Sequence, residues 1–240
     1  PADYLKLRKH FVAMLETMDI IHYNSSLTKS VYNSIWKPKA DKSRVISITH
    51  SGISAHSELK EFNSPILRIT FLGAQSEAKG YFFLRKALDE IQNTGKHFVL
   101  NVPFSPTEPR TYINNIGRYN SSQIGGIMKI TDVLIVPSIW NETFGFTVIE
   151  ALSYGVPVVV SDCVGSKDVI PRGGGIVFDH LSVQSLISAI NELNADTLRA
   201  MNKSIIDAKP VKSICELSFE IKDKLYSGNW SINRQKGDRN

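Results

Sequence analysis

The chain has 240 residues, which is enough for one or two domains and a substantial buried core. Hydrophobic residues make up 42% and charged residues 21%, which excludes wholesale disorder. The longest apolar runs, such as 155–160, are far too short to span a bilayer. We expect no secretory signal, and because the first residue is Pro1 rather than Met, we expect a processed chain or a fragment.

The net charge is modest. Lys and Arg number 28 and Asp and Glu 23, which gives +5. Such a balance favours anionic partners without choosing among phosphates, lipid headgroups and nucleic acid, and an ordinary solvated surface explains it equally well. No nucleic-acid motif is present, so we expect no nucleic-acid partner, while peripheral association with a membrane stays compatible with the charge.

The two cysteines indicate a reducing compartment. Cys163 and Cys215 form neither a CxxC motif nor a Cys/His ligand cluster in the sequence. We therefore expect no disulfide framework and no zinc site, and we expect the chain in the cytoplasm.

The first 62 residues differ from the rest. The pattern predicts helices at 3–17 and 27–36, a strand at 44–49 and a linker at 51–64. These are too few strands for a sheet of their own. We interpret residues 1–62 as the last βαβ piece of an incomplete domain, followed by an interdomain crossover.

Residues 63–227 alternate short β-branched runs with amphipathic stretches, and 228–240 form a polar tail. We expect strands at 67–72, 97–102, 112–116, 133–136, 156–160 and 175–178. We expect helices at 80–91, 121–130, 144–154 and 164–170, and mostly helix from 182 to 227. This alternation predicts an α/β fold with a doubly wound parallel sheet, covered on both faces.

The segment 132–162 carries the most information. It is predicted as strand, irregular loop, helix and strand, with Thr143 as the helix N-cap and Gly155 followed by Pro157 at the end. The helical period divides its side chains between a face that packs on the sheet (Phe144, Val148, Ala151, Leu152) and a smaller, more polar face (Thr147, Glu150, Tyr154).

The start of this helix is suited to a phosphate. The first turn of a helix has unpaired N–H groups, and in an open parallel sheet it lies where ligands bind. Gly145 lets a ligand approach closely. Glu142 and Glu150 would lie about 10 Å apart, so they can bind hydroxyls at two ends of one elongated ligand but cannot form a tight dyad. With 11 Glu in the chain, that spacing alone arises by chance.

The surrounding residues make the pattern specific: Pro137-Ser138, Glu142-Thr143-Phe144-Gly145, Glu150-Ala151-Leu152, Gly155-Val156-Pro157-Val158-Val159 and Ser161-Asp162. This segment closely resembles the donor-binding domain of retaining glycosyltransferases of family 4, also called group 1. That family has the GT-B architecture of two facing Rossmann-like domains. Other segments agree in order: Phe71-Leu72-Gly73, Lys79-Gly80, Gly117-Arg118-Tyr119, 173–178, 19–25 and 44–53.

The resemblance implies two residues close to the reaction. Lys79 would neutralise the diphosphate leaving group, and Glu142 would face the hydroxyls of the transferred sugar. A lysine together with a helix start can supply the positive charge, so we expect neither a cofactor nor a metal.

The resemblance also implies a set of donor-binding residues. Glu150 would hold the ribose hydroxyls, and the main chain near Arg118 and Tyr119 would frame the base. The rest would meet the diphosphate or line the donor site: Gly73, Phe144, Gly145, Phe146 and Thr147.

Two departures from the family pattern stand out. The family usually has Arg directly after the first-strand glycine, where this chain has Ala74, and Arg118 and Gln75 are the candidates to replace its charge. The crossover, often PNG in the family, is His50-Ser51-Gly52 here. A histidine in such a place more often packs or is exposed, so we assign His50 no catalytic role.

The resemblance implies a hexosyltransferase of retaining type in polysaccharide or glycoconjugate biosynthesis. The donor would be a UDP-, GDP- or ADP-sugar, and the acceptor a glycan or a lipid-linked molecule at the inner face of the membrane. The acceptor domain would precede residue 1, so we expect this chain alone to be inactive. Two alternatives stay open, a sugar-nucleotide epimerase of the same fold and a non-catalytic nucleotide-binding module. Ala74 supports the second of these. A dehydrogenase is disfavoured because the glycine fingerprint after the first strand is missing.

Overall fold

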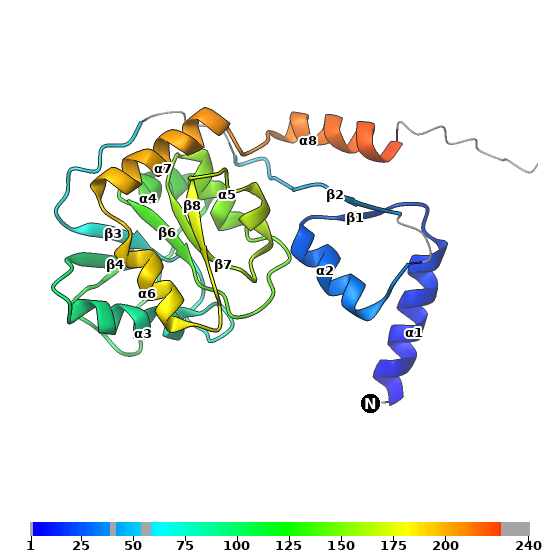
Figure 1. The fold of residues 1–240 in the computed structure, drawn as a ribbon, viewed down its shortest axis with the longest axis horizontal. Helices are drawn as coiled ribbons and strands as arrows, with labels where there is room; N and C mark the ends of the chain where they lie inside the picture. Colours follow the sequence, from blue (N-terminus) through cyan, green and yellow to red (C-terminus); the bar gives the residue numbers. More distant parts are fainter. Residues whose placement is uncertain (1, 39–41, 54–58, 227–240) are drawn as a thin grey trace, which may run out of the picture.

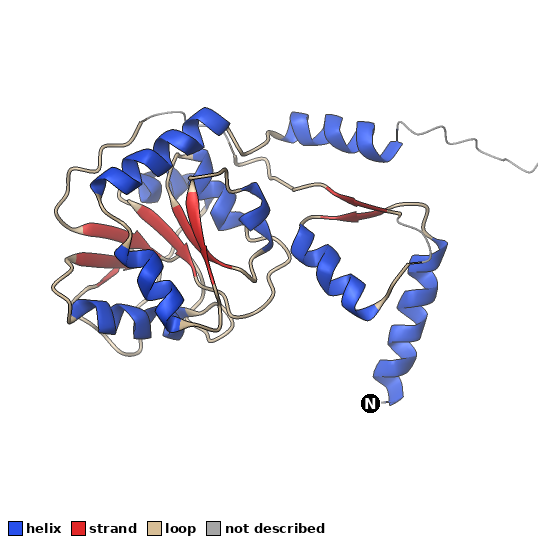
Figure 2. Ribbon diagram, in the orientation of Figure 1, coloured by secondary structure: helices blue, strands red, loops and turns tan. Residues whose placement is uncertain are grey.

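A six-stranded parallel sheet forms the centre of the molecule (Figures 1 and 2). The computed structural model of the chain describes residues 2–38, 42–53 and 59–226. The strand order is β5-β4-β3-β6-β7-β8. The strands are β3 (Leu67–Thr70), β4 (Phe98–Val102), β5 (Ile113–Asn115), β6 (Val133–Val136), β7 (Val158–Ser161) and β8 (Gly175–Phe178). Because the order reverses between β3 and β6, the carboxyl ends of these neighbours form the topological switch point, where such sheets bind ligands.

Helices cover both faces of the sheet, as the pattern predicts. Along β6, Val133 and Ile135 belong to one core cluster, with apolar residues of α3 (Tyr81–Gln92) and α6 (Val183–Asn191). Leu134 and Val136 belong to the other, with residues of α4 (Ile124–Lys129) and α5 (Phe146–Ser153). The helices of this domain are α3 (Tyr81–Gln92), α4 (Ile124–Lys129), α5 (Phe146–Ser153), α6 (Val183–Asn191), α7 (Ala195–Ala208) and α8 (Ile214–Ile221). The doubly wound α/β fold is confirmed.

The N-terminal segment lies beside this domain (Figure 1). It contains α1 (Ala2–Thr17), β1 (Ile21–Tyr23), α2 (Ser26–Ile35) and β2 (Ser43–Val45). The expectation that it forms no sheet of its own is wrong, because β1 and β2 pair in parallel with α2 between them. β2 is shorter than the strand predicted at 44–49: the last bond of the pair joins the Ile46 N–H to the Tyr23 carbonyl, where β1 ends.

Three short helices differ from the predicted ones. The stretch 164–170 is a 3-10 turn, η2 (Gly165–Val169), and the helix expected at 121–130 begins as a 3-10 turn, η1 (Ser121–Gln123). A π-helical turn, η3 (Lys222–Tyr226), follows α8. The polar tail 228–240 and the linker residues 54–58 lie outside the described residues. Across the described ranges, no helix has the length and apolar character needed to cross a membrane.

Candidate functional site

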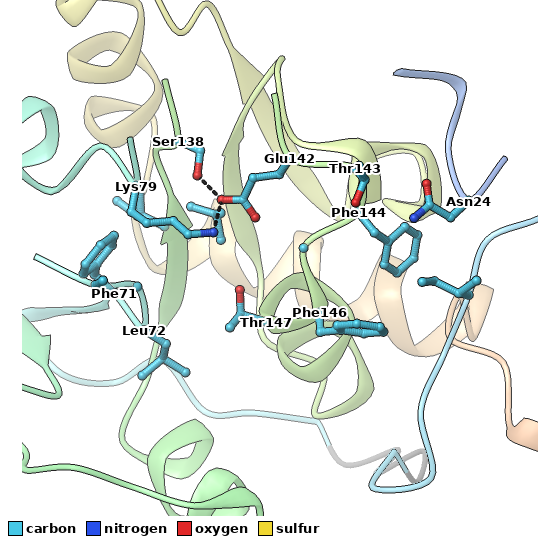
Figure 3. A pocket seen from close by; sticks show the side chains of 16 residues that line it. Asn24, Phe71, Leu72, Lys79, Ser138, Glu142, Thr143, Phe144, Phe146 and Thr147 are labelled. Carbon is cyan, nitrogen blue, oxygen red and sulfur yellow. Dashed lines mark hydrogen bonds and ion pairs between the residues drawn. The ribbon is translucent and has the colours of Figure 1, made fainter. Parts of the chain in front are cut away.

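A cavity of about 390 Å³ lies at the switch point, between the sheet and the N-terminal segment (Figure 3). Its walls are the loop after β3, the end of β6 and the chain around the start of α5, and Asn24 and Ile48 contribute from the N-terminal segment. Seven predicted site residues line it: Gly73, Lys79, Glu142, Phe144, Gly145, Phe146 and Thr147. The fold thus brings these seven together from separate stretches of sequence.

Glu142 is held firmly on one wall of the cavity. Its backbone forms a parallel bridge with Val164, through the bond from Glu142 N–H to the Cys163 carbonyl and the bond from Gly165 N–H to the Glu142 carbonyl, both 2.9 Å. Its Oε1 accepts a hydrogen bond from Ser138 Oγ and forms an ion pair with Lys79 Nζ at 2.8 Å (Figure 3). The carboxylate is therefore fixed in orientation and only 13% exposed.

Lys79 is placed by the close packing of its loop on the residues that follow β6. Gly80, which precedes α3, has φ +71°, and a Cβ atom there would lie 1.6 Å from the Pro137 carbonyl oxygen. The Ile139 N–H also donates to the Ala78 carbonyl at 3.1 Å. Among the described residues that line the cavity, Lys79 is the one cation.

The helix start differs from the predicted one. The N-cap of α5 is Gly145, with φ +97°, and not Thr143. Thr143 lies before the helix, and its carbonyl accepts hydrogen bonds from the hydroxyls of Ser25 (2.7 Å) and Thr28 (3.1 Å). A glycine cap has no side-chain oxygen, and no side-chain hydrogen bond caps the helix. The first N–H groups of α5 therefore remain available to an anion.

Glu150 does not line the cavity but lies one turn into α5, beside the crossover. Its Oε1 is 3.3 Å from His50 Nε2, and its side chain is 17% exposed. Burial raises the pKa of Glu150 above its ordinary value, and the neighbouring His50 partly offsets this rise. Sequence reasoning missed this partner, because no motif links two residues that are 100 positions apart.

The two residues predicted to frame the base are placed differently from each other. Tyr119 is half-buried, and burial and the charge of Glu150 both raise its pKa. Arg118 is exposed and does not line the cavity. Ala74 lines it, whereas the Gln75 side chain donates to the Thr107 hydroxyl instead.

A small cluster at the ends of β7 and β8 brings Cys163 close to a histidine and a carboxylate, a grouping that the sequence did not indicate. Possible ligand atoms of Asp162, Cys163 and His180 lie within 4.8 Å of one another, because adjacent strands bring together residues that are far apart in sequence. Protein partners already engage them: Cys163 Sγ donates to the Ser138 carbonyl at 2.8 Å, and His180 Nδ1 lies 2.6 Å from Asp162 Oδ1. Burial raises the pKa of the Cys163 thiol, which disfavours the thiolate that a metal would need.

The N-terminal segment is tied to this region by contacts that the sequence did not reveal. Ser26 donates to Asp168 of η2 through its backbone N–H (2.5 Å) and through its hydroxyl (2.7 Å). Together with the bonds from Ser25 and Thr28, these contacts hold the N-terminal segment against η2 and the chain before α5.

Comparison with known proteins finds a similar family for part of the sheet domain. Residues 107–209 match the family model described as "Glycosyl transferases group 1". Over this region the chain is similar to that family. The match begins before β5 and includes β6, α5, β7, β8, α6 and α7, so it covers the wall with Glu142 and the start of α5.

Characterised and uncharacterised glycosyltransferases are similar in sequence. An uncharacterized glycosyltransferase of Methanocaldococcus jannaschii is 26% identical over 187 residues, 67% of this chain and 46% of its own length. D-inositol 3-phosphate glycosyltransferase of Corynebacterium aurimucosum is 26% identical over 221 residues, 80% of this chain and 50% of its own length. The chain spans half or less of the length of these curated relatives.

Solved glycosyltransferase structures share the GT-B type of fold. A glycosyltransferase from Rickettsia africae superposes with a TM-score of 0.73 and 16% identity, over 92% of this chain and 68% of its own. HepE from Anabaena, solved with UDP and glucose, gives a TM-score of 0.70 and 15% identity, over 92% and 66%. At these identities the likeness shows the fold alone.

Proposed function

We propose that the chain is the donor-binding part of a retaining glycosyltransferase of family 4, which binds a nucleotide-diphosphate sugar in the switch-point cavity. One observation carries the proposal: the cavity joins a lysine, a fixed carboxylate and an uncapped helix start at the carboxyl ends of β3 and β6. These groups suit the charged and the hydroxylated parts of such a donor.

In this proposal the site stabilises the departing nucleotide. Loss of a nucleoside diphosphate develops negative charge, and Lys79 together with the N–H groups of Phe146 and Thr147 would stabilise that charge. Glu142 would accept hydrogen bonds from hydroxyls of the transferred sugar, and Glu150 from the ribose. Since Lys79 and the two N–H groups can neutralise the leaving group, we propose a reaction without a metal cofactor.

The complete enzyme would contain more protein than this chain. We propose that residues 1–62 end the acceptor-side domain, 63–227 form the donor domain, and transfer requires the acceptor-side sequence of the relatives. Exposed apolar side chains on the N-terminal helices support this, because they suit burial against further protein: Leu5 (55%), Leu7 (53%), Phe11 (48%) and Ile35 (46%).

We propose a hexose donor, and a glycan or lipid-linked acceptor reached at the inner face of the membrane in the cytoplasm. Two similar proteins support a role in building cell-surface glycans. A 27% identical relative from Bacillus subtilis, matched over 121 residues, is named a putative teichuronic acid biosynthesis glycosyltransferase. The structurally similar WaaG is described as involved in lipopolysaccharide biosynthesis.

A panel of UDP-, GDP- and ADP-sugars tests the donor by thermal shift, because a ligand that binds only the folded chain raises its melting temperature. We expect one nucleotide class to raise it, with or without added EDTA. If none does, nucleotide binding is refuted. If binding occurs but the chain interconverts donor sugars without an acceptor, the epimerase alternative replaces the transferase.

A further inference from the structure

His50 of the crossover has an orientation that two contacts determine. The Gly52 N–H donates to its Nδ1 at 3.1 Å, so Nδ1 acts as an acceptor and the ring proton belongs on Nε2. Nε2 in turn lies 3.3 Å from Glu150 Oε1. The turn is closed by a further bond from the Ile53 N–H to the His50 carbonyl at 3.2 Å. Nε2 therefore presents a donor to the carboxylate.

Packing holds the same ring against the first turn of α5. The ring centroids of His50 and Phe146 are 5.4 Å apart with an interplanar angle of 81°, an edge-to-face arrangement. Phe146 lines the cavity, and Glu150 follows it one helical turn later. His50 thus contacts both the wall of the cavity and the carboxylate beside it.

Glu150 needs such a partner because its surroundings disfavour the ionised form. Burial raises the pKa of its carboxyl, and the contact with His50 lowers it again. Tyr119 also interacts electrostatically with Glu150, and a tyrosine is neutral at ordinary pH. When His50 holds Oε1, Oε2 is the oxygen that can turn to a ligand.

We propose that His50 is a positioning residue for Glu150: the crossover turn at 50–53 aims the imidazole Nε2 at the carboxylate and orients it toward the ribose hydroxyls of the donor. This rests on the proposed donor-binding function. The specificity for ribose over deoxyribose then depends on a residue that lies outside the donor domain, in the segment that joins it to the N-terminal part.

Calorimetric titration tests this with the tightest binder among UDP, GDP and ADP, and with its 2′-deoxy counterpart. The variants are His50→Phe, which keeps the ring packing but removes the donor, and His50→Gln, which restores a neutral donor. We expect His50→Phe to weaken the ribonucleotide about tenfold and leave the deoxynucleotide nearly unchanged, and His50→Gln to recover most of the discrimination.

A matched control is His97→Phe, which should change neither affinity, because this exposed histidine directly precedes β4 and so lies at the amino end of the strands, opposite the cavity. Equal weakening of both nucleotides by His50→Phe would show a merely structural role and overturn the proposal, as would unchanged ribonucleotide binding. If no nucleoside diphosphate binds the unsubstituted chain, the proposed function itself fails, which is a separate result.

Discussion

Lys79 and Glu142 lie 63 residues apart in sequence and form an ion pair of 2.8 Å inside the cavity. Lys79 is 44% exposed, so the pair contributes little to stability. The ion pair matters for ligand binding. In the free chain Lys79 already has a carboxylate partner, and a bound diphosphate would share Lys79 with Glu142. The pair keeps Lys79 directed into the cavity before any ligand arrives.

Replacing Lys79 should affect binding and leave the fold intact. We expect Lys79→Met to weaken a nucleoside diphosphate about 10- to 100-fold, because one charge-assisted hydrogen bond is worth roughly 1.5–3 kcal/mol. The free energy of unfolding should change by less than about 0.5 kcal/mol. Calorimetry and denaturant unfolding measure the two. Lys86→Met, at an exposed position of α3, is the matched control, and an equal loss of affinity in both variants would contradict the role of Lys79.

Removing the Glu150 carboxylate should weaken donor binding to a similar extent. We expect Glu150→Ala to raise the Kd about 10- to 100-fold, since the ribose would lose a charge-assisted hydrogen bond. Nucleotides with and without ribose hydroxyls, compared by calorimetry, separate this loss from a general disturbance of α5. Unchanged affinity in the variant would remove Glu150 from the site.

The Glu150 carboxylate should lower the free energy of unfolding at neutral pH. Burial raises the pKa of Glu150 above its value in the unfolded chain. Between those two values the folded state binds more protons than the unfolded state, so the free energy of unfolding falls as the pH rises through this window. Glu150→Gln removes the ionisable group and with it this fall in the free energy of unfolding. We expect the variant to be more stable than the unsubstituted chain at about pH 7.5, with an advantage that shrinks toward about pH 4, as urea unfolding at each pH would show.

The sheet and its strands were predictable because their signal is local. The uninterrupted apolar run VLIV gave β6 its bounds, since a strand that is buried on both faces needs apolar residues at every position. The start of α5 was not predictable, because Gly145 caps it in a left-handed conformation that the surrounding chain imposes. A Cβ there would lie 3.0 Å from Val164 and 3.1 Å from Ser166, residues that come from the loop after β7.

The candidate site was predictable in part for the same reason. The motif around Glu142 is contiguous and was visible, as was the lysine before Gly80. The partner of Glu150 was not visible in the sequence, because His50 reaches it through a turn of the crossover. The packing of two segments that are distant in sequence determines that contact. The hydroxyls of Ser25 and Ser26 escaped notice likewise, since serines carry no signal until the fold places them against Thr143 and Asp168.

Gly80 should be indispensable to the Lys79 loop. Its φ of +71° costs an L-residue about 1–2 kcal/mol, and a methyl group 1.6 Å from the Pro137 carbonyl oxygen would push the loop away from β6 at a further cost of about 1–3 kcal/mol. We expect Gly80→Ala to lower the free energy of unfolding by about 2–5 kcal/mol in urea titrations and to weaken nucleotide binding, because Lys79 would move with the loop. Gly95→Ala separates the two causes: Gly95 has φ +82° but nothing within 4 Å of the added Cβ, so only the backbone cost should appear. Equal destabilisation by both substitutions would show that contact with Pro137 does not position the lysine.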